Sequence, residues 1–201
     1  MKTTVLLAVE QAVRAIEVLK EPHNLQFIEQ AAEMIATCFE NNHKILIAGN
    51  GGSLCDAAHF AEELTGQFRH RRKALPAIAL SDPGHLTCVA NDMGYDNVFA
   101  RGVEALGQSG DIFIGLTTSG NSPNIFKAVM LAKEMGLQTI AFLGKTGGML
   151  KDKSDLELHI PGFPYSDRVQ EVHMAAIHII IERIEEKLFV EKRLPLWVAA
   201  H

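Results

Sequence analysis

Five short apolar runs, separated by stretches with helical periodicity, constrain the fold of this chain more than any other feature. The runs lie at residues 44–49, 76–80, 111–116, 138–144 and 156–160. Their apolar content is nearly continuous rather than alternating, which is typical of strands buried on both faces of a parallel sheet. The sequence therefore predicts an α/β fold, with a doubly wound open sheet of about five parallel strands flanked by helices.

Helical periodicity fills most of the remaining chain. Two N-terminal helices are expected over 3–20 and 25–41, with a break at Glu21-Pro22. Further helices are expected near 54–65, 96–107 and 123–135, and from Asp167 to about Phe189. There is no repeat or linker, so we expect a single domain over 1–201, which includes the N-terminal helices (1–42) and the C-terminal helix (167–189). The tail 190–201 is expected either to pack on a neighbouring subunit or to fray.

Charge and composition exclude several classes of protein. The net charge of −5 gives no basic field, so nucleic acid is not an expected partner. Glu10 and Arg14 interrupt the first apolar run, and no segment is long enough to span a bilayer, so no membrane association is expected. Cys38, Cys55 and Cys88 are odd in number and lack CxxC spacing, which indicates reduced, partly buried thiols in a cytoplasmic protein.

Two loops that follow predicted strands are rich in glycine and hydroxyl groups. In "GNGGS" (49–53), Ser53 is the expected N-cap of a helix, and in "TTSGNSP" (117–123), Ser122 and Pro123 are expected as N-cap and first helical residue. Either loop alone is more often a tight turn with an ordinary cap. Two such loops at the carboxyl edge of one sheet favour a phosphate site. Neither contains the dinucleotide fingerprint or the P-loop lysine, so NAD and ATP are poor candidates.

Polar side chains on two apolar helices form a possible metal-ligand set. His59 and Glu63 are four residues apart, and Gln170 and His178 are eight apart, so each pair shares a helix face. Taken singly, these residues have simpler interpretations. A histidine on an apolar helix face is usually a core residue, Glu63 could be a solvated carboxylate, and Gln170 could be the capping-box partner of Asp167. Together they provide four side chains of the kinds that bind zinc. Their joint presence beside the two loops favours a catalytic site.

Other polar stretches give weaker signals. "NDMG" (91–94) stands at the end of a short helical turn, where such a stretch more often marks the end of a helix than a binding site. The basic run "RHRRK" (69–73) is expected to be a solvated loop, because a specific anion or nucleic-acid patch is the rarer case.

Over about residues 3–190, the chain resembles the phosphoheptose isomerases of the sugar isomerase (SIS) superfamily. The stretches that carry the resemblance are "GNGGSLCDAAHFAEELTG", "LPAIALSD", "ANDMGYDNVFARGVEALG", "GDIFIGLTTSGNSPNIFKAV" and "DRVQEVHMAAIHIIIE". The resemblance implies a SIS domain with a flavodoxin-like three-layer sandwich and N-terminal helices for oligomerisation. It also implies a homotetramer whose active sites are built from neighbouring subunits.

The resemblance also implies a reaction: enediol isomerisation of D-sedoheptulose 7-phosphate to D-glycero-D-manno-heptose 7-phosphate, the first step of ADP-heptose and lipopolysaccharide core synthesis. It implies one Zn²⁺ per subunit, held by His59, Glu63, Gln170 and His178, with Glu63 and His178 as base and acid. The implied substrate-binding residues are Asn50, Gly51, Gly52, Ser53, Glu63, Asn91, Asp92, Thr117, Thr118, Ser119, Ser122, Asp167 and Gln170.

Three positions depart from the family pattern, and two alternative functions stay open. Thr117 stands where Ser is common, which keeps the hydroxyl group. Leu54 stands where the family often has His, and Gln67 where it often has Arg, which affects substrate contacts rather than the reaction type. Some relatives bind the bacterial replication initiator instead of acting as enzymes. Those relatives lack the equivalents of Glu63 and His178, and this chain keeps both, which favours the enzyme. The weaker alternative is a sugar-phosphate-sensing regulatory domain, because no DNA-binding or catalytic module is attached.

Overall fold

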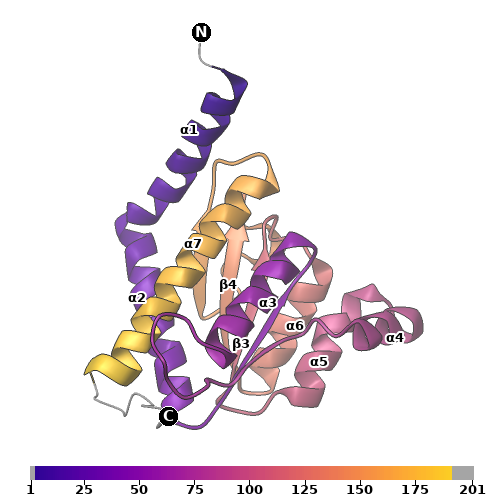
Figure 1. Cartoon of the computed structure of the whole chain (residues 1–201). Coiled ribbons are helices and arrows are strands. Elements are labelled where there is room, and N and C mark those ends of the chain that lie inside the picture. Colours follow the sequence, from indigo (N-terminus) through magenta and orange to yellow (C-terminus); the bar gives the residue numbers. More distant parts are fainter. Residues whose placement is uncertain (1–2, 192–201) are drawn as a thin grey trace.

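The computed structural model describes residues 3–191 and has the expected parallel sheet at its centre (Figure 1). The strands are β1 (Ile45–Gly49), β2 (Ala77–Ala79), β3 (Ile112–Thr117), β4 (Gln138–Gly144) and β5 (Leu156–Ile160). They lie in the order β2-β1-β3-β4-β5, and every neighbouring pair is parallel. All residues of β1 and β3 are buried, which explains why their sequences are continuously apolar. The predicted fold class is confirmed.

The helices follow the predicted pattern with three differences, of which the start of the third helix is described with the site. They are α1 (Thr4–Glu17), α2 (Pro22–Glu40), α3 (Gly52–Thr65), α4 (Pro83–Met93), α5 (Val98–Leu106), α6 (Pro123–Glu134) and α7 (Ser166–Glu185). Short 3-10 turns cover Val18–Lys20, Tyr95–Asn97 and Gly148–Leu150, and a π-helical segment, Glu186–Glu191, extends α7. Helix α2 begins three residues earlier than predicted because Pro22 occupies its first turn, where the missing N–H costs nothing.

Helix α4 was not predicted, because only a short helical turn was expected around Asn91. Its start nevertheless has a sequence signal: Asp82 accepts a hydrogen bond from the His85 amide (2.7 Å), and Pro83 follows as the first residue. Leu86, Val89 and Ala90 have helical spacing and pack against the core, Val89 being buried and the other two partly buried, so the sequence also contained a short apolar stripe that was overlooked.

The helices cover both faces of the sheet and give three layers. Side chains of α2, α3 and α7 pack on one face, around Ile47, Ile114 and Phe142. Side chains of α5 and α6 pack on the other face, around Phe113 and Ala141. Helix α1 runs away from this body in Figure 1 and contacts α7. No helix within residues 3–191 combines the length and the apolar character needed to cross a membrane.

The prediction that residues 69–73 form a solvated loop was wrong for Arg72, whose side chain is buried. Its Nε donates to Glu185 Oε1 (2.7 Å), and its other nitrogens donate to the carbonyl oxygens of Leu64 and Glu63 (2.9 Å each). The second oxygen of Glu185 accepts from the backbone amides of Arg69 and His70 (3.2 Å each). This network holds the loop against α3 and α7, and its partners lie too far apart in the chain for a local pattern to reveal it.

Candidate functional site

The sheet order reverses direction at β1 and β3, and ligands of open α/β sheets bind beyond the carboxyl ends of the strands at such a point. Gly49 pairs with Leu116, so the two loops that follow these strands lie side by side. The amides of Asn50 and Asn124 exchange two hydrogen bonds of 2.9 Å, which ties the first loop to the start of α6. The Tyr95 hydroxyl also donates to Asn50 (2.9 Å). The sequence analysis missed both Asn124 and Tyr95.

The first loop turns at a glycine with a backbone conformation that other residues rarely adopt. Gly51 has φ +55° and is the N-cap of α3, which begins at Gly52. The expectation that Ser53 is the N-cap was wrong: Ser53 lies inside the first turn, is buried, and donates its amide to the Asn50 carbonyl (3.1 Å). The positive φ of Gly51 sets the helix start. A Cβ at Gly51 would meet nothing within 4 Å, so this part of the loop faces open space.

The second loop is held by its own hydroxyl groups. Ser122 is the N-cap of α6 and Pro123 its first residue, as predicted, although the Ser122 side chain makes no capping bond. Instead, Ser122 Oγ lies 2.9 Å from Thr117 Oγ1, and Thr118 donates to Ser166 Oγ (3.0 Å). Ser119 Oγ accepts from the Asn121 amide (3.1 Å). The hydroxyl groups therefore fix the loop beside a helix N-terminus, the arrangement that suits a phosphate.

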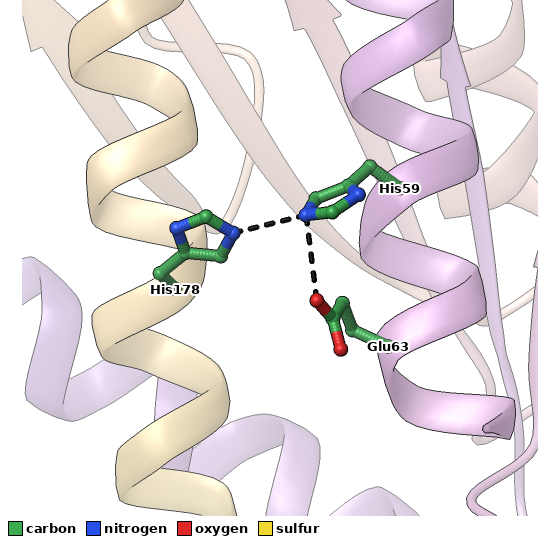
Figure 2. A group of neighbouring side chains, drawn as sticks. All are labelled: His59, Glu63 and His178. Atoms are coloured by element: carbon green, nitrogen blue, oxygen red, sulfur yellow. Dashed lines mark hydrogen bonds and ion pairs between the residues drawn. The ribbon is translucent and has the colours of Figure 1, made fainter. Parts of the chain in front are cut away.

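Figure 2 shows three potential metal ligands that converge from two helices. His59 and Glu63 extend from α3, and His178 extends from α7. His59 Nε2 lies 3.0 Å from His178 Nε2 and 3.5 Å from Glu63 Oε1, and one ligand atom from each residue lies within 4.8 Å of the others. Ligands of a tetrahedral zinc ion, bound at about 2.0–2.2 Å, are roughly 3.3 Å apart. The donor set and its spacing therefore fit a zinc ion.

Neighbouring side chains orient the rings of His59 and His178. Glu62 Oε1 lies 3.0 Å from His59 Nδ1, so it can accept the proton of that nitrogen and leave Nε2 as the ligand atom. The Phe68 ring stacks on His178, with centroids 5.8 Å apart at 26°. The pKa of His178 is lowered, mainly by burial and also by His59 and Arg69, against the opposite effect of Glu63. His178 is therefore held toward its neutral form, which can bind a metal or accept a proton.

Asp56 lies one turn before His59 on α3 and was missed by the sequence analysis. Its Oδ2 is buried and has no hydrogen-bond partner, and burial raises the pKa of Asp56 to about 6, against the lowering effect of His59. Its spacing could have revealed it, because a residue three positions before His59 lies on the same face of the helix.

Gln170 lies in the first turns of α7 with its side-chain amide against the first loop. A Cβ placed on Gly52 would lie 2.5 Å from Gln170 Nε2. The capping-box interpretation of Gln170 is wrong, because α7 has Tyr165 as its N-cap and Asp167 is already helical. Asp167 accepts a hydrogen bond from the Arg168 amide (2.8 Å). The roles of Gln170 as fourth ligand and of Asp167 in substrate binding stay predictions.

Asn91 and Asp92 lie in the last turn of α4. Helix α4 lies at the margin of the molecule in Figure 1. Both side chains are exposed, and Asn91 donates to Asp92 Oδ1 (2.7 Å). Their role in sugar binding stays a prediction.

His173 on α7 is a histidine of the core. Its side chain is fully buried, and Nε2 lies 3.2 Å from the Leu143 carbonyl. Burial lowers the pKa of His173 to about 4, so the ring is neutral near pH 7. His173 therefore stabilises the contact of α7 with β4 and lies outside the ligand set.

Replacing Gly52 with alanine should weaken the site without unfolding the protein. The new Cβ would displace the end of the flexible Gln170 side chain, whereas alanine at the start of a helix is well tolerated. For the isomerisation that the family resemblance implies, we expect kcat/KM to fall about tenfold or more, equivalent to about 1.4 kcal/mol. The urea midpoint of unfolding should change little. Gln170→Ala should then cost little more in the Gly52→Ala background; fully additive losses would contradict the contact.

Comparisons with known proteins show the family to which this chain belongs. Residues 9–144 match the model of the SIS domain family. The chain is 55% identical over 170 residues to the phosphoheptose isomerase of Vibrio cholerae, covering 85% of this chain and 89% of the relative. It is 56% identical over 173 residues to that of Fusobacterium nucleatum, covering 86% and 89%. The solved phosphoheptose isomerase of Neisseria gonorrhoeae superposes with a TM-score of 0.82 at 40% identity, covering 90% of this chain and 97% of that one.

Proposed function

This chain belongs to the SIS domain family, and we propose that it is an aldose–ketose isomerase that converts D-sedoheptulose 7-phosphate to D-glycero-D-manno-heptose 7-phosphate. The observation that carries the proposal is the convergence of His59, Glu63 and His178 from two helices that both reach the first loop, since α3 begins at Gly52 and α7 places Gln170 against it. An acid–base pair next to an anion site is what the isomerisation of a phosphorylated sugar requires.

The reaction moves a proton between C1 and C2 of the sugar through an enediol. In our proposal, the Asn50–Ser53 loop and the Thr117–Ser122 loop hold the phosphate and part of the sugar. Glu63 then removes the proton from one carbon and returns it to the other. His178 moves the second proton between the two oxygens, and its lowered pKa keeps the ring available as an acceptor near pH 7.

A zinc ion would be held by His59, Glu63 and His178, with Gln170 as the proposed fourth ligand. When bound, it would polarise the carbonyl group and stabilise the negative charge that develops on oxygen. Glu62 would fix the His59 ring through Nδ1. A carboxylate bound to a metal is a weaker base, so a zinc ion held by Glu63 would lower the strength of this residue as a base.

The proposal extends to the assembly of the protein and its place in the cell. We expect a homotetramer that acts in the cytoplasm in synthesis of the lipopolysaccharide core. Helix α1 supports an oligomer, because Val5, Val9 and Val13 on it are more than half exposed. Cys38, Cys55 and Cys88 are unpaired, Cys38 being buried and the other two exposed, which fits a reducing compartment.

The proposed function is tested by incubating the purified protein with sedoheptulose 7-phosphate and following aldose formation, before and after chelation. We expect turnover that chelation abolishes and zinc restores, with one zinc bound per chain. Turnover that survives complete removal of the metal would exclude the zinc role. A folded, zinc-loaded protein without turnover would overturn the proposal that the chain is this isomerase. It would favour the alternative that the chain binds the replication initiator.

A further inference from the structure

An apolar groove of about 510 Å³ lies at the edge of the sheet opposite the proposed active site. Its walls are the end of α2 (Phe39 and Glu40), the segment 73–76 before β2, and Leu188 and Phe189 after α7. These segments precede β1 and β2 in the chain or end α7, whereas the catalytic loops follow β1 and β3. A ligand in the groove would therefore be remote from the proposed chemistry.

We propose that the groove is the docking site of the C-terminal segment of the same chain, residues 192–201. The segment starts where the groove ends, because Phe189 lines the groove and the π-helical turn finishes at Glu191. At roughly 3.3 Å per residue, Trp197 can reach about 20 Å from Glu191, so the segment can lie along the groove. Its sequence "KRLPLWVAAH" places Leu194, Leu196 and Trp197 together, an apolar set that matches the apolar part of the lining. The apolar part consists of Phe39, Ala74, Leu75, Pro76, Leu188 and Phe189. The polar residues beside it are Glu40, Asn42 and Lys73.

The same chain is favoured over a second copy by its tether. A segment joined directly to the wall of its site is present at a high effective concentration, of millimolar order for short linkers, so modest apolar contacts suffice to dock it. Pro195 restricts the backbone and reduces the entropy lost on docking. Burial of a tryptophan side chain removes about 150–250 Å² from water, which makes Trp197 the expected anchor.

Trp197 is the only tryptophan of the chain, so its fluorescence reports docking directly. The test compares the intact protein, Ala74→Arg, Ala105→Arg and a free peptide of residues 190–201. Ala74 is exposed and lines the groove, whereas Ala105 is exposed on α5. The intact protein and Ala105→Arg should emit at shorter wavelength than the peptide and be quenched several-fold less by acrylamide. Ala74→Arg should shift to the values of the peptide and keep its enzymatic activity.

Three results would overturn the proposal. Intact protein that is quenched as readily as the peptide would show that Trp197 is not buried. An Ala74→Arg protein with unshifted emission would place Trp197 elsewhere. The third concerns the tether: Ala74→Arg chains can be co-assembled with Trp197→Phe chains, whose grooves keep Ala74 and are not blocked by an arginine. Recovery of short-wavelength emission in these mixed oligomers would show that the segment docks on a neighbouring subunit.

Discussion

Replacing Glu63 with glutamine should lower kcat for isomerisation by roughly 10²- to 10⁴-fold, the usual contribution of a general base. Glutamine keeps the shape of the side chain but cannot accept a proton from carbon. The fold should be unaffected, because the contact that Glu63 makes with Arg72 uses its backbone carbonyl. Binding of the substrate phosphate should also persist, since the two loops that are proposed to hold it do not depend on this carboxylate.

The measurement pairs kcat and KM with exchange of the substrate C1 proton in heavy water. Glu63→Gln should lose both turnover and exchange while keeping its urea midpoint. Glu62→Gln is the matched control: it removes one charge from the neighbouring residue, which contacts His59 Nδ1, and its amide oxygen can still accept that bond. Glu62→Gln should therefore lower turnover and proton exchange far less than Glu63→Gln. Exchange at the normal rate in Glu63→Gln would remove Glu63 from the role of base.

The sequence was most informative where a pattern reflects burial directly. The strands β1 and β3 are buried along their whole length, so their apolar runs are unambiguous. Helix α4 has a shorter stripe, in which only Val89 is fully buried while Leu86 and Ala90 are partly buried, so its pattern was less evident although the Asp82-Pro83 pair marked its start. The start of α3 was misplaced because the positive φ of Gly51, rather than the side chain of Ser53, determines it.

For the candidate site, spacing grouped residues within a helix but not between helices. The four-residue spacing of His59 and Glu63 put both on one face of α3, whereas their approach to His178 depends on how α3 and α7 pack on the sheet. Family resemblance supplied that pairing. Phe68 was missed because its contact with His178 depends on a loop that is held in place by distant residues.

The residue that holds this loop gives the second large prediction. Replacing Arg72 with methionine should destabilise the protein by about 3–5 kcal/mol, the typical cost of breaking a buried ion pair by removing one partner. The side chains of Arg72 and Glu185 are 0% and 1% exposed, so Glu185 would be left charged and out of reach of water. The Glu63 carbonyl would also lose the hydrogen bond that Arg72 donates. The Leu64 carbonyl would lose one such bond and keep the one from the Leu75 amide.

Arg69→Met is the matched control for Arg72→Met, because Arg69 lies in the same loop and its ion pair with Glu182 also reaches α7. That pair is half exposed, and exposed pairs contribute at most about 1 kcal/mol. Both variants should be unfolded in urea at one protein concentration, since assembly affects the midpoint. A loss in Arg72→Met no larger than that in Arg69→Met would mean that the buried pair does not hold the loop. If the loop is held as we infer, Arg72→Met should also lower turnover, because the Phe68 ring that packs on His178 would lose its support.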